Sequence, residues 1–369
     1  MTKVRRHDID WIRVLVFDIL IIYHVGMFFV PWGWHIKNND IVEWMQLPMF
    51  FVNQWRLPIL FVVSGIGTRY ALSYRSGNEY IKERVKRLLI PLIVGILIII
   101  PPQVYLERLV QGNFTGNFFQ FYPSFFQGIY PTGNFSWHHL WFLPYLLLMS
   151  LIFTPLFLRW RASESKFIKW VKQLLNKSPL YIYIFTIPIL FVEAFMEPLF
   201  PVTLALYGDW YTLMLYGLLF IYGFVLISTG EAFWRAVDKI KPIALIVGIL
   251  IFPILLWYKR NVDSSVWIPI LVIFNMWSWI LAIIGYSAKF LNNNSTLIKY
   301  RNQAVYPFYI LHQTITVILG YYLINSPMHY GLKFMIMLIG TFGLSWVLYE
   351  FIIRRIKIIR PLFGLKNQT

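Results

Sequence analysis

The sequence predicts an all-α polytopic membrane protein with about ten transmembrane helices and both termini in the cytoplasm. The 369 residues are 58% hydrophobic and only 13% charged, whereas soluble domains contain about 25% charged residues. Apolar stretches long enough to cross a bilayer recur along the whole chain. Lysine and arginine are concentrated in alternate connecting segments, as in multi-pass proteins.

The expected helices each approach the ~20 residues that span a hydrocarbon core. They cover residues 12–33, 47–72, 84–102, 139–158, 179–197, 211–229, 241–258, 266–287, 303–323 and 331–353. No repeat or appended soluble domain interrupts them, so we predict a single integral-membrane domain over residues 1–369. The first apolar stretch is too long for the core of a cleavable signal peptide and is expected to remain as a helix.

The orientation follows from the basic residues, which cytoplasmic loops retain. With the N-terminus inside, only six of the 33 lysines and arginines fall in outer segments: Lys37, Arg56, Arg108, Lys259, Arg260 and Lys333. The net charge of +17 is therefore explained by topology and contact with anionic lipid, and no nucleic-acid partner is predicted. Cysteine is absent, which excludes disulfides and thiolate metal sites; no metal site is predicted.

The first helix carries ionisable residues, which mark functional sites at membrane depth. Arg13 and His24 are eleven residues apart, or three turns, so they share one face about 16 Å apart. Asp10 lies one turn before Arg13 and can pair with it, whereas Asp18 points elsewhere. Histidine accepts protons near neutral pH. His24 is thus a candidate catalytic base, the alternative being an interhelical hydrogen bond.

Arg84 and Arg87 lie one turn apart at the predicted start of the third helix. Two guanidinium groups beside the free N–H groups of a helix N-terminus are suited to a phosphate. The alternative is ordinary anchoring at the cytoplasmic boundary.

Weaker candidates lie elsewhere in the chain. His312 is expected near the middle of the ninth helix, and His139 at the outer mouth of the fourth. Arg56 either binds an acidic acceptor or extends to lipid headgroups. The aromatic outer segment 103–138 is either an interfacial belt or a lid that packs on a carbohydrate.

Several motifs together resemble the type 3 family of integral-membrane acyltransferases. The resemblance covers nearly the whole chain and rests on "DIDWIR" with ten residues between Arg13 and His24, the Arg84–Arg87 pair, "LPILFVVSG", "HLWFLPYLL" and "YILH". The segments "WHIKNND" and "RPLFGLK" are similar to the branch related to the periplasmic glucan succinyltransferase.

The resemblance implies a multi-pass enzyme of the bacterial inner membrane that transfers an acyl group, acetyl or succinyl, from cytoplasmic acyl-CoA to a hydroxyl of an extracytoplasmic carbohydrate or glycan. His24 maps to the essential histidine, and Arg13, Arg84 and Arg87 map to the acyl-CoA-binding arginines. Glu350 is the nearest match to a glutamate near the last helix, although its usual proline context is missing. Acyl-CoA is a donor substrate, and no permanently bound cofactor is implied.

Two other classes of function fit the sequence. A transporter or exporter of a glycan or lipid-linked sugar also has many helices with buried polar groups and prolines. A non-catalytic membrane protein would tolerate the loss of His24. The identity of the acyl group and acceptor, the oligomeric state, and whether His24 acts as a base or is transiently acylated are not encoded in these motifs.

Overall fold

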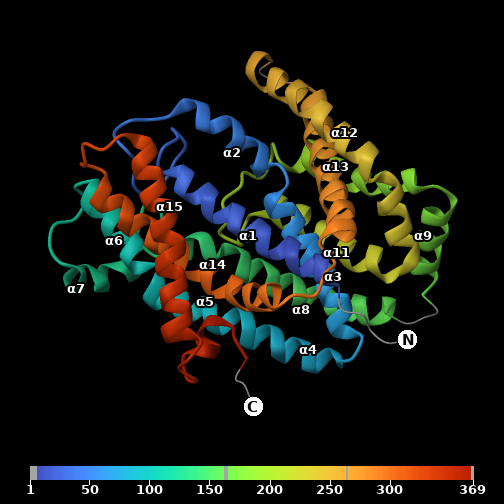
Figure 1. Cartoon of the computed structure of the whole chain (residues 1–369), viewed down its shortest axis with the longest axis horizontal. Helices are drawn as coiled ribbons and strands as arrows, with labels where there is room; N and C mark the ends of the chain where they lie inside the picture. The colour runs from blue at the N-terminus through green and yellow to red at the C-terminus, as the bar shows by residue number, and fades with distance from the viewer. Residues whose placement is uncertain (1–5, 162–164, 263–264, 367–369) are drawn as a thin grey trace. The chain divides into compact units, whose positions relative to one another are not determined.

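The computed structural model describes residues 6–161, 165–262 and 265–366, and within them the chain is helical, as predicted (Figure 1). The only β-type pairing among these residues is an isolated bridge between Ile129 and Phe135. The chain groups into two compact units. The first unit comprises Met1–Val16, Phe51–Lys82 and Leu148–Lys299, and the second comprises Phe17–Phe50, Glu83–Leu147 and Tyr300–Thr369. The prediction of one domain over residues 1–369 stays a prediction.

Eight helical stretches in the described residues are long and apolar enough to span a membrane. They are Glu43–Leu72, Gly77–Val110, His138–Trp160, Pro179–Met196, Trp210–Ser228, Glu231–Asn261, Trp267–Phe290 and Tyr330–Ile353. These stretches make the protein a multi-pass membrane protein. The count of ten spans and the orientation of the termini stay predictions.

The remaining two predicted spans are also helices, α1 (His7–Met27) and α14 (Thr296–Leu323). Both carry polar residues within the apolar part of the helix: α1 carries Asp10, Arg13 and Asp18, and α14 carries His312 and Gln313. The two predicted spans that are not among the eight stretches therefore carry His24 and His312, whereas the third predicted histidine, His139, lies in the stretch His138–Trp160.

The third predicted helix is longer than its apolar core. It begins at Gly77 rather than at residue 84 and ends at Val110. It is built from α4 (Gly77–Arg84), the π-helical turn η2 (Val85–Leu89), α5 (Ile90–Val94), the π-helical turn η3 (Gly95–Ile99) and α6 (Pro101–Val110). Hydropathy does not reveal the polar first turns, so the predicted N-terminus at residue 84 was wrong.

Prolines explain why this helix is interrupted and how it is held. Proline has no N–H, so the carbonyl four residues before it loses its helical donor. Pro91 affects the carbonyl of Arg87, which accepts a hydrogen bond from the Tyr306 hydroxyl at 2.8 Å. Pro101 affects the carbonyl of Leu97, which accepts from the Tyr122 hydroxyl at 3.0 Å. Tyrosine hydroxyls thus replace the lost donors and fix the helix to α14 and to the outer segment.

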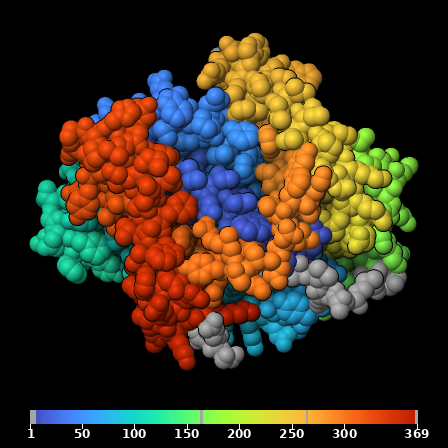
Figure 2. All heavy atoms as spheres, viewed as in Figure 1, coloured from blue at the N-terminus to red at the C-terminus, as the bar shows by residue number. Residues whose placement is uncertain are grey.

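The first unit is organised around two closely packed helix pairs. One joins α3 (Arg56–Leu72) to α11 (Trp210–Ser228), and the other joins α12 (Glu231–Asn261) to α13 (Trp267–Phe290). Figure 2 shows α12 and α13, in yellow and orange, side by side. The α3–α11 pair meets at Gly65 and Gly223. A Cβ atom on Gly65 would lie 2.0 Å from the Phe220 carbonyl oxygen, and one on Gly223 would lie 2.0 Å from that of Val62. Only glycine permits this approach.

The first unit also contains a helix that the sequence analysis missed. Helix α9 (Lys166–Lys177) is amphipathic, with lysines on one side and Val171 and Leu175 buried. It lies in a segment predicted only as a basic loop. Basic amphipathic helices of this kind lie in the plane of a membrane surface, and the 3.6-residue spacing of its apolar residues was the available signal.

The second unit contains the C-terminal half of α1, α6, α14 and α15 (Tyr330–Val347), which continues into the π-helical turn η8 (Leu348–Ile353). Between α1 and the next helix, residues 28–42 form no helix. The other elements of the chain are η1 (Glu43–Met45), α2 (Gln46–Asn53), α7 (Phe118–Phe121), η4 (Tyr122–Phe126), η5 (His138–Trp141), α8 (Phe142–Trp160), η6 (Pro179–Phe185), α10 (Thr186–Phe191), η7 (Val192–Met196) and η9 (Arg360–Phe363).

The α3–α11 crossing predicts the effect of one added methyl group. Gly65→Ala should destabilise the protein by about 1–3 kcal/mol, because backbone atoms must move to admit the Cβ atom. Gly67→Ala on the same helix is the matched control, since its Cβ atom would meet nothing closer than 3.8 Å, and it should be neutral or slightly stabilising. Thermal unfolding in detergent measures both. Equal midpoints for the two variants would contradict the close contact.

Candidate active site

Two histidines from distant parts of the chain meet in the second unit. The Nδ1 atom of His24, near the end of α1, lies 2.7 Å from the Nε2 atom of His312 on α14. Their rings are nearly parallel, with centroids 5.0 Å apart and an angle of 2° between the planes. His312 is fully buried, whereas His24 is partly exposed. His24 thus joins a fully buried partner while remaining partly exposed itself.

The hydrogen bonds of His312 define the tautomer of both rings when they are neutral. The Nδ1 atom of His312 lies 2.7 Å from the Tyr309 carbonyl oxygen and 3.2 Å from that of Phe308. Carbonyl oxygens only accept, so this Nδ1 carries the proton and the Nε2 atom of His312 is an acceptor. His24 must then donate from Nδ1, which leaves the Nε2 atom of His24 unprotonated. That nitrogen carries the lone pair that a general base or nucleophile requires.

His139 lies beside this pair, at 5.1 Å between its ring centroid and that of His312. Its Nε2 atom donates to the Ile310 carbonyl at 3.0 Å, and its backbone carbonyl accepts from the Tyr309 hydroxyl. His139 is 6% exposed. Its Nδ1 atom is buried and has no hydrogen-bond partner in the described part of the chain. The structure therefore brings together the predicted residues His24, His312 and His139.

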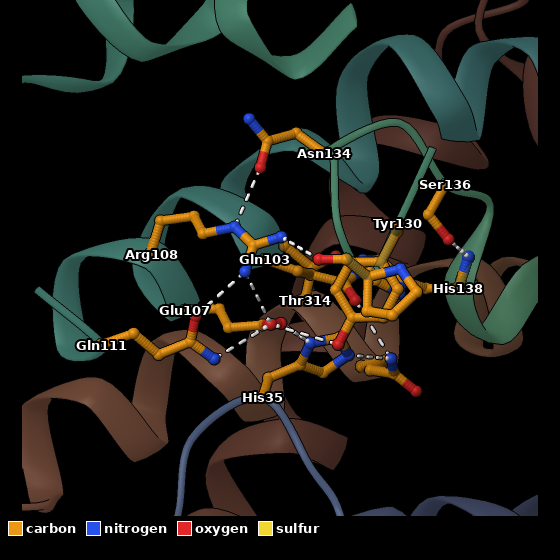
Figure 3. A network of polar contacts seen from close by, with 12 residues as sticks. His35, Gln103, Glu107, Arg108, Gln111, Tyr130, Asn134, Ser136, His138 and Thr314 are labelled. Atoms are coloured by element: carbon orange, nitrogen blue, oxygen red, sulfur yellow. Dashed lines mark hydrogen bonds and ion pairs between the residues drawn. The ribbon is translucent and has the colours of Figure 1, made fainter. Parts of the chain in front are cut away.

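A second polar network surrounds His35 (Figure 3). The Nδ1 atom of His35 pairs with the Glu107 carboxylate, and both side chains are buried. The Nε2 atom of His35 accepts from the Gln313 amide at 3.0 Å. Gln313 also donates to Gln103 at 3.1 Å, and Gln103 donates to the Thr314 hydroxyl at 2.6 Å. The network joins the 28–42 segment to α6 and α14.

Tyr130 completes the network from the outer segment. Its hydroxyl donates to Glu107 at 3.1 Å, and Gln111 donates to the same carboxylate oxygen at 3.3 Å. Burial, with a further contribution from the Glu107 charge, raises the pKa of Tyr130 to about 12. The phenol therefore remains protonated and acts as a donor. The His138 ring packs edge-on against His35 and Tyr130, with centroids 4.5 and 4.8 Å away.

Arg84 and Arg87 lie in the second unit, but they are not at a helix N-terminus. The helix begins seven residues earlier, so the N–H groups of its first turn are not available beside them. The prediction that these N–H groups assist phosphate binding was therefore wrong. Arg84 is partly exposed and Arg87 is exposed, and the Arg87 guanidinium lies 3.8 Å from Glu83. The Arg87 carbonyl is the one that Pro91 deprives of its helical donor, so the hydrogen bond from the Tyr306 hydroxyl also fixes the Arg87 backbone.

The other predicted residues have local partners. Arg13 pairs with Asp10 at 3.5 Å in the first unit, which confirms the predicted ion pair. Asp18 accepts two hydrogen bonds from Arg301 of α14, at 2.5 and 2.6 Å. Arg56 is 5% exposed and donates to Asn53 at 2.9 Å. Because it is buried, it does not lie at the surface where it would extend to headgroups.

Glu350 lies in the π-helical turn η8. It accepts from the Tyr300 hydroxyl at 2.9 Å and from Arg354 at 2.8 Å. These contacts fix the end of the last helix. The assignment of Glu350 as a member of the site stays a prediction.

Three further residues near the site, His35, Glu107 and Trp34, were not predicted from the sequence. His35 and Trp34 occur in "WHIKNND", which contributed to the family resemblance but received no role. Glu107 lies in the outer segment 103–138, which was interpreted from its aromatic residues alone as a belt or a lid. A carboxylate among aromatic residues at a predicted membrane boundary was the available signal, because such a group needs a polar partner.

The chain is similar in sequence to a known family and to several named proteins, in agreement with the family resemblance described above. A family model described as an acyltransferase domain matches residues 6–350. Proteins named glucans biosynthesis protein C from Escherichia coli and Shigella dysenteriae are 22% identical over 379 residues, which covers 98% of this chain and 95% of theirs. No solved structure matches the chain.

The hydrogen-bond pattern of His312 predicts the protonation of His24. Neutral His24 should carry its hydrogen on Nδ1, because the Nε2 atom of His312 can only accept. Nitrogen-15 chemical shifts of histidine-labelled protein in bilayers distinguish the two tautomers, and the His24→Ala variant assigns the signals. His312→Leu removes the acceptor and should produce a mixture of tautomers at His24. A neutral His24 with its hydrogen on Nε2 in the wild type would contradict this pattern.

Proposed function

The chain belongs to the acyltransferase family whose model matches it, and on that premise we propose that it transfers an acyl group from acyl-CoA to a hydroxyl of a carbohydrate. The acyl group is acetyl or succinyl. The name of the glucans biosynthesis protein C relatives supports a glucan as the acceptor. We place the enzyme in the bacterial inner membrane, with the donor on the cytoplasmic side and the acceptor on the other side.

The observation that carries the proposal is the hydrogen bond between His24 and His312. It supports a neutral His24 whose Nε2 atom is a proton acceptor, on a side chain that is partly exposed. In the reaction, this nitrogen takes the proton of the acceptor hydroxyl as the hydroxyl oxygen forms an ester bond to the acyl carbon. The bond between that carbon and the CoA sulfur breaks. The proton then passes from His24 to the thiolate, which leaves as free CoA.

Arg84 and Arg87 support the donor part of the proposal. The phosphate groups of CoA are costly to bring into hydrocarbon, so they are expected to bind near a surface. Arginine binds phosphate through charge-assisted, often bidentate hydrogen bonds. The exposure of Arg87 and partial exposure of Arg84 leave both guanidinium groups accessible to a ligand.

Reconstitution tests the function directly. Purified protein in proteoliposomes should convert acyl-CoA and gluco-oligosaccharides into free CoA and an acylated sugar, detected by mass. His24→Ala and His24→Gln should lower the transfer rate by about 10²–10⁴-fold while acyl-CoA still binds, since neither side chain can accept a proton.

His329→Ala is the matched control for the loss of a histidine. His329 is exposed at the start of α15, where its ring accepts from the Gly331 N–H. This variant should retain wild-type transfer. Near wild-type transfer in His24→Gln would show that His24 serves only as a hydrogen-bonding residue. Absence of any transfer by the wild type would overturn the proposed function.

The arginine pair predicts the salt dependence of donor binding. Replacing Arg84 and Arg87 with glutamine should raise the Kd for acyl-CoA about tenfold or more, and the wild-type Kd should rise with ionic strength. The double variant of Arg355→Gln and Lys357→Gln removes the same charge from two exposed residues and should bind normally. Equal losses in the two double variants would mean that net charge, rather than this pair, attracts the donor.

A further inference from the structure

We propose that Trp34 is the platform on which a sugar ring of the acceptor stacks, so that one of its hydroxyl groups reaches His24. This inference rests on the proposed function and names the part of the site that selects a carbohydrate. It concerns the segment of residues 28–42, to which the family resemblance assigns no role.

Trp34 contacts the candidate base directly. Its ring centroid lies 5.2 Å from that of His24, with 32° between the planes, and 5.1 Å from that of His35. Four apolar residues of the segment are almost fully buried, namely Phe28, Phe29, Val30 and Ile36, whereas Trp32 is partly exposed and Ile41 is exposed. Trp34 is partly exposed, like His24. Trp34 is distinguished from the other exposed residues of the segment by its contact with the partly exposed imidazole of His24.

The segment that carries Trp34 is fixed by polar contacts on both sides of it. His35, the next residue, is held by the Glu107 and Gln313 contacts described above. The Lys37 ammonium donates to the carbonyl oxygens of Met27, at 2.6 Å, and Val30.

Further along, Asn38 accepts from the buried Lys333 at 2.8 Å, and its backbone N–H donates to the Phe28 carbonyl at 2.8 Å. A non-helical segment would otherwise lose considerable conformational entropy when it binds a ligand. These contacts place Trp34 against His24 in advance, and such preorganisation lowers the free-energy cost of binding.

A carbohydrate fits this arrangement because a pyranose has two chemically different surfaces. Its flat face carries C–H groups, which pack on an indole ring, and its rim carries hydroxyl groups. Because the two ring centroids are 5.2 Å apart, a sugar that packs on the exposed part of the indole is placed to present a rim hydroxyl group to His24, where the proposed proton transfer takes place. The pantetheine arm of CoA is a flexible chain without such a flat face, so it would gain less from an indole platform.

The test separates acceptor binding from donor binding. Trp34→Ala should weaken binding of gluco-oligosaccharides, and raise their KM in transfer, by about tenfold or more. The Kd for acyl-CoA should stay within about twofold of the wild-type value, which also shows that the variant is folded. Trp34→Phe retains a smaller aromatic face and should recover part of the loss.

Trp32→Ala is the matched control. Trp32 lies in the same segment and is also partly exposed, but its ring packs near Tyr23, with centroids 6.3 Å apart. It should bind the oligosaccharide normally. Equal losses in Trp32→Ala and Trp34→Ala, or a Trp34→Ala effect on acyl-CoA alone, would overturn the proposal. Oligosaccharide binding is measured without donor, so it tests the platform even if no transfer occurs and the proposed function fails.

Discussion

Polar groups within a bilayer must find their hydrogen-bond partners inside the protein, because hydrocarbon offers none. In the second unit this constraint determines which elements meet. The carbonyl oxygens that Pro91 and Pro101 leave without helical donors are bonded by tyrosine hydroxyls from α14 and the outer segment. Asp18 requires a cation, and Arg301 supplies it from α14. The same requirement brings His312 to His24.

The need for internal hydrogen-bond partners also explains how the non-helical segment 28–42 is stabilised beside the site. Residues 28–42 form no helix and make only a few backbone hydrogen bonds, so side chains from α6, α14 and α15 supply further partners. The buried Glu107 and Lys333 are the charged members of this set. Breaking one member of such a network leaves the others buried without partners, which costs more than the net contribution of a single hydrogen bond. The polar residues that hold the segment are therefore also the ones that keep Trp34 in contact with His24.

Much of the fold could be predicted from the sequence because its signals are local. Apolar stretches located the helices, and the three-residue spacing of Asp10 and Arg13 predicted their ion pair. The polar first turns at Gly77 were missed because hydropathy detects only the part of a helix that matches hydrocarbon. The partners of the site residues were not predictable, since 288 positions separate His24 from His312 and 72 separate His35 from Glu107. A single sequence contains no periodicity that links such positions.

The carbonyl oxygens around His312 also limit the route of the proton. His312 holds its own hydrogen on Nδ1, so it does not pass protons away from His24 without disrupting two backbone contacts. In the proposed reaction, a single nitrogen must then both receive the proton of the hydroxyl and return it to the sulfur. The nucleophile and the leaving group have to approach the same edge of one imidazole ring. This geometry favours a compact transition state in which the two substrates lie against each other, and it leaves no role for a separate acid.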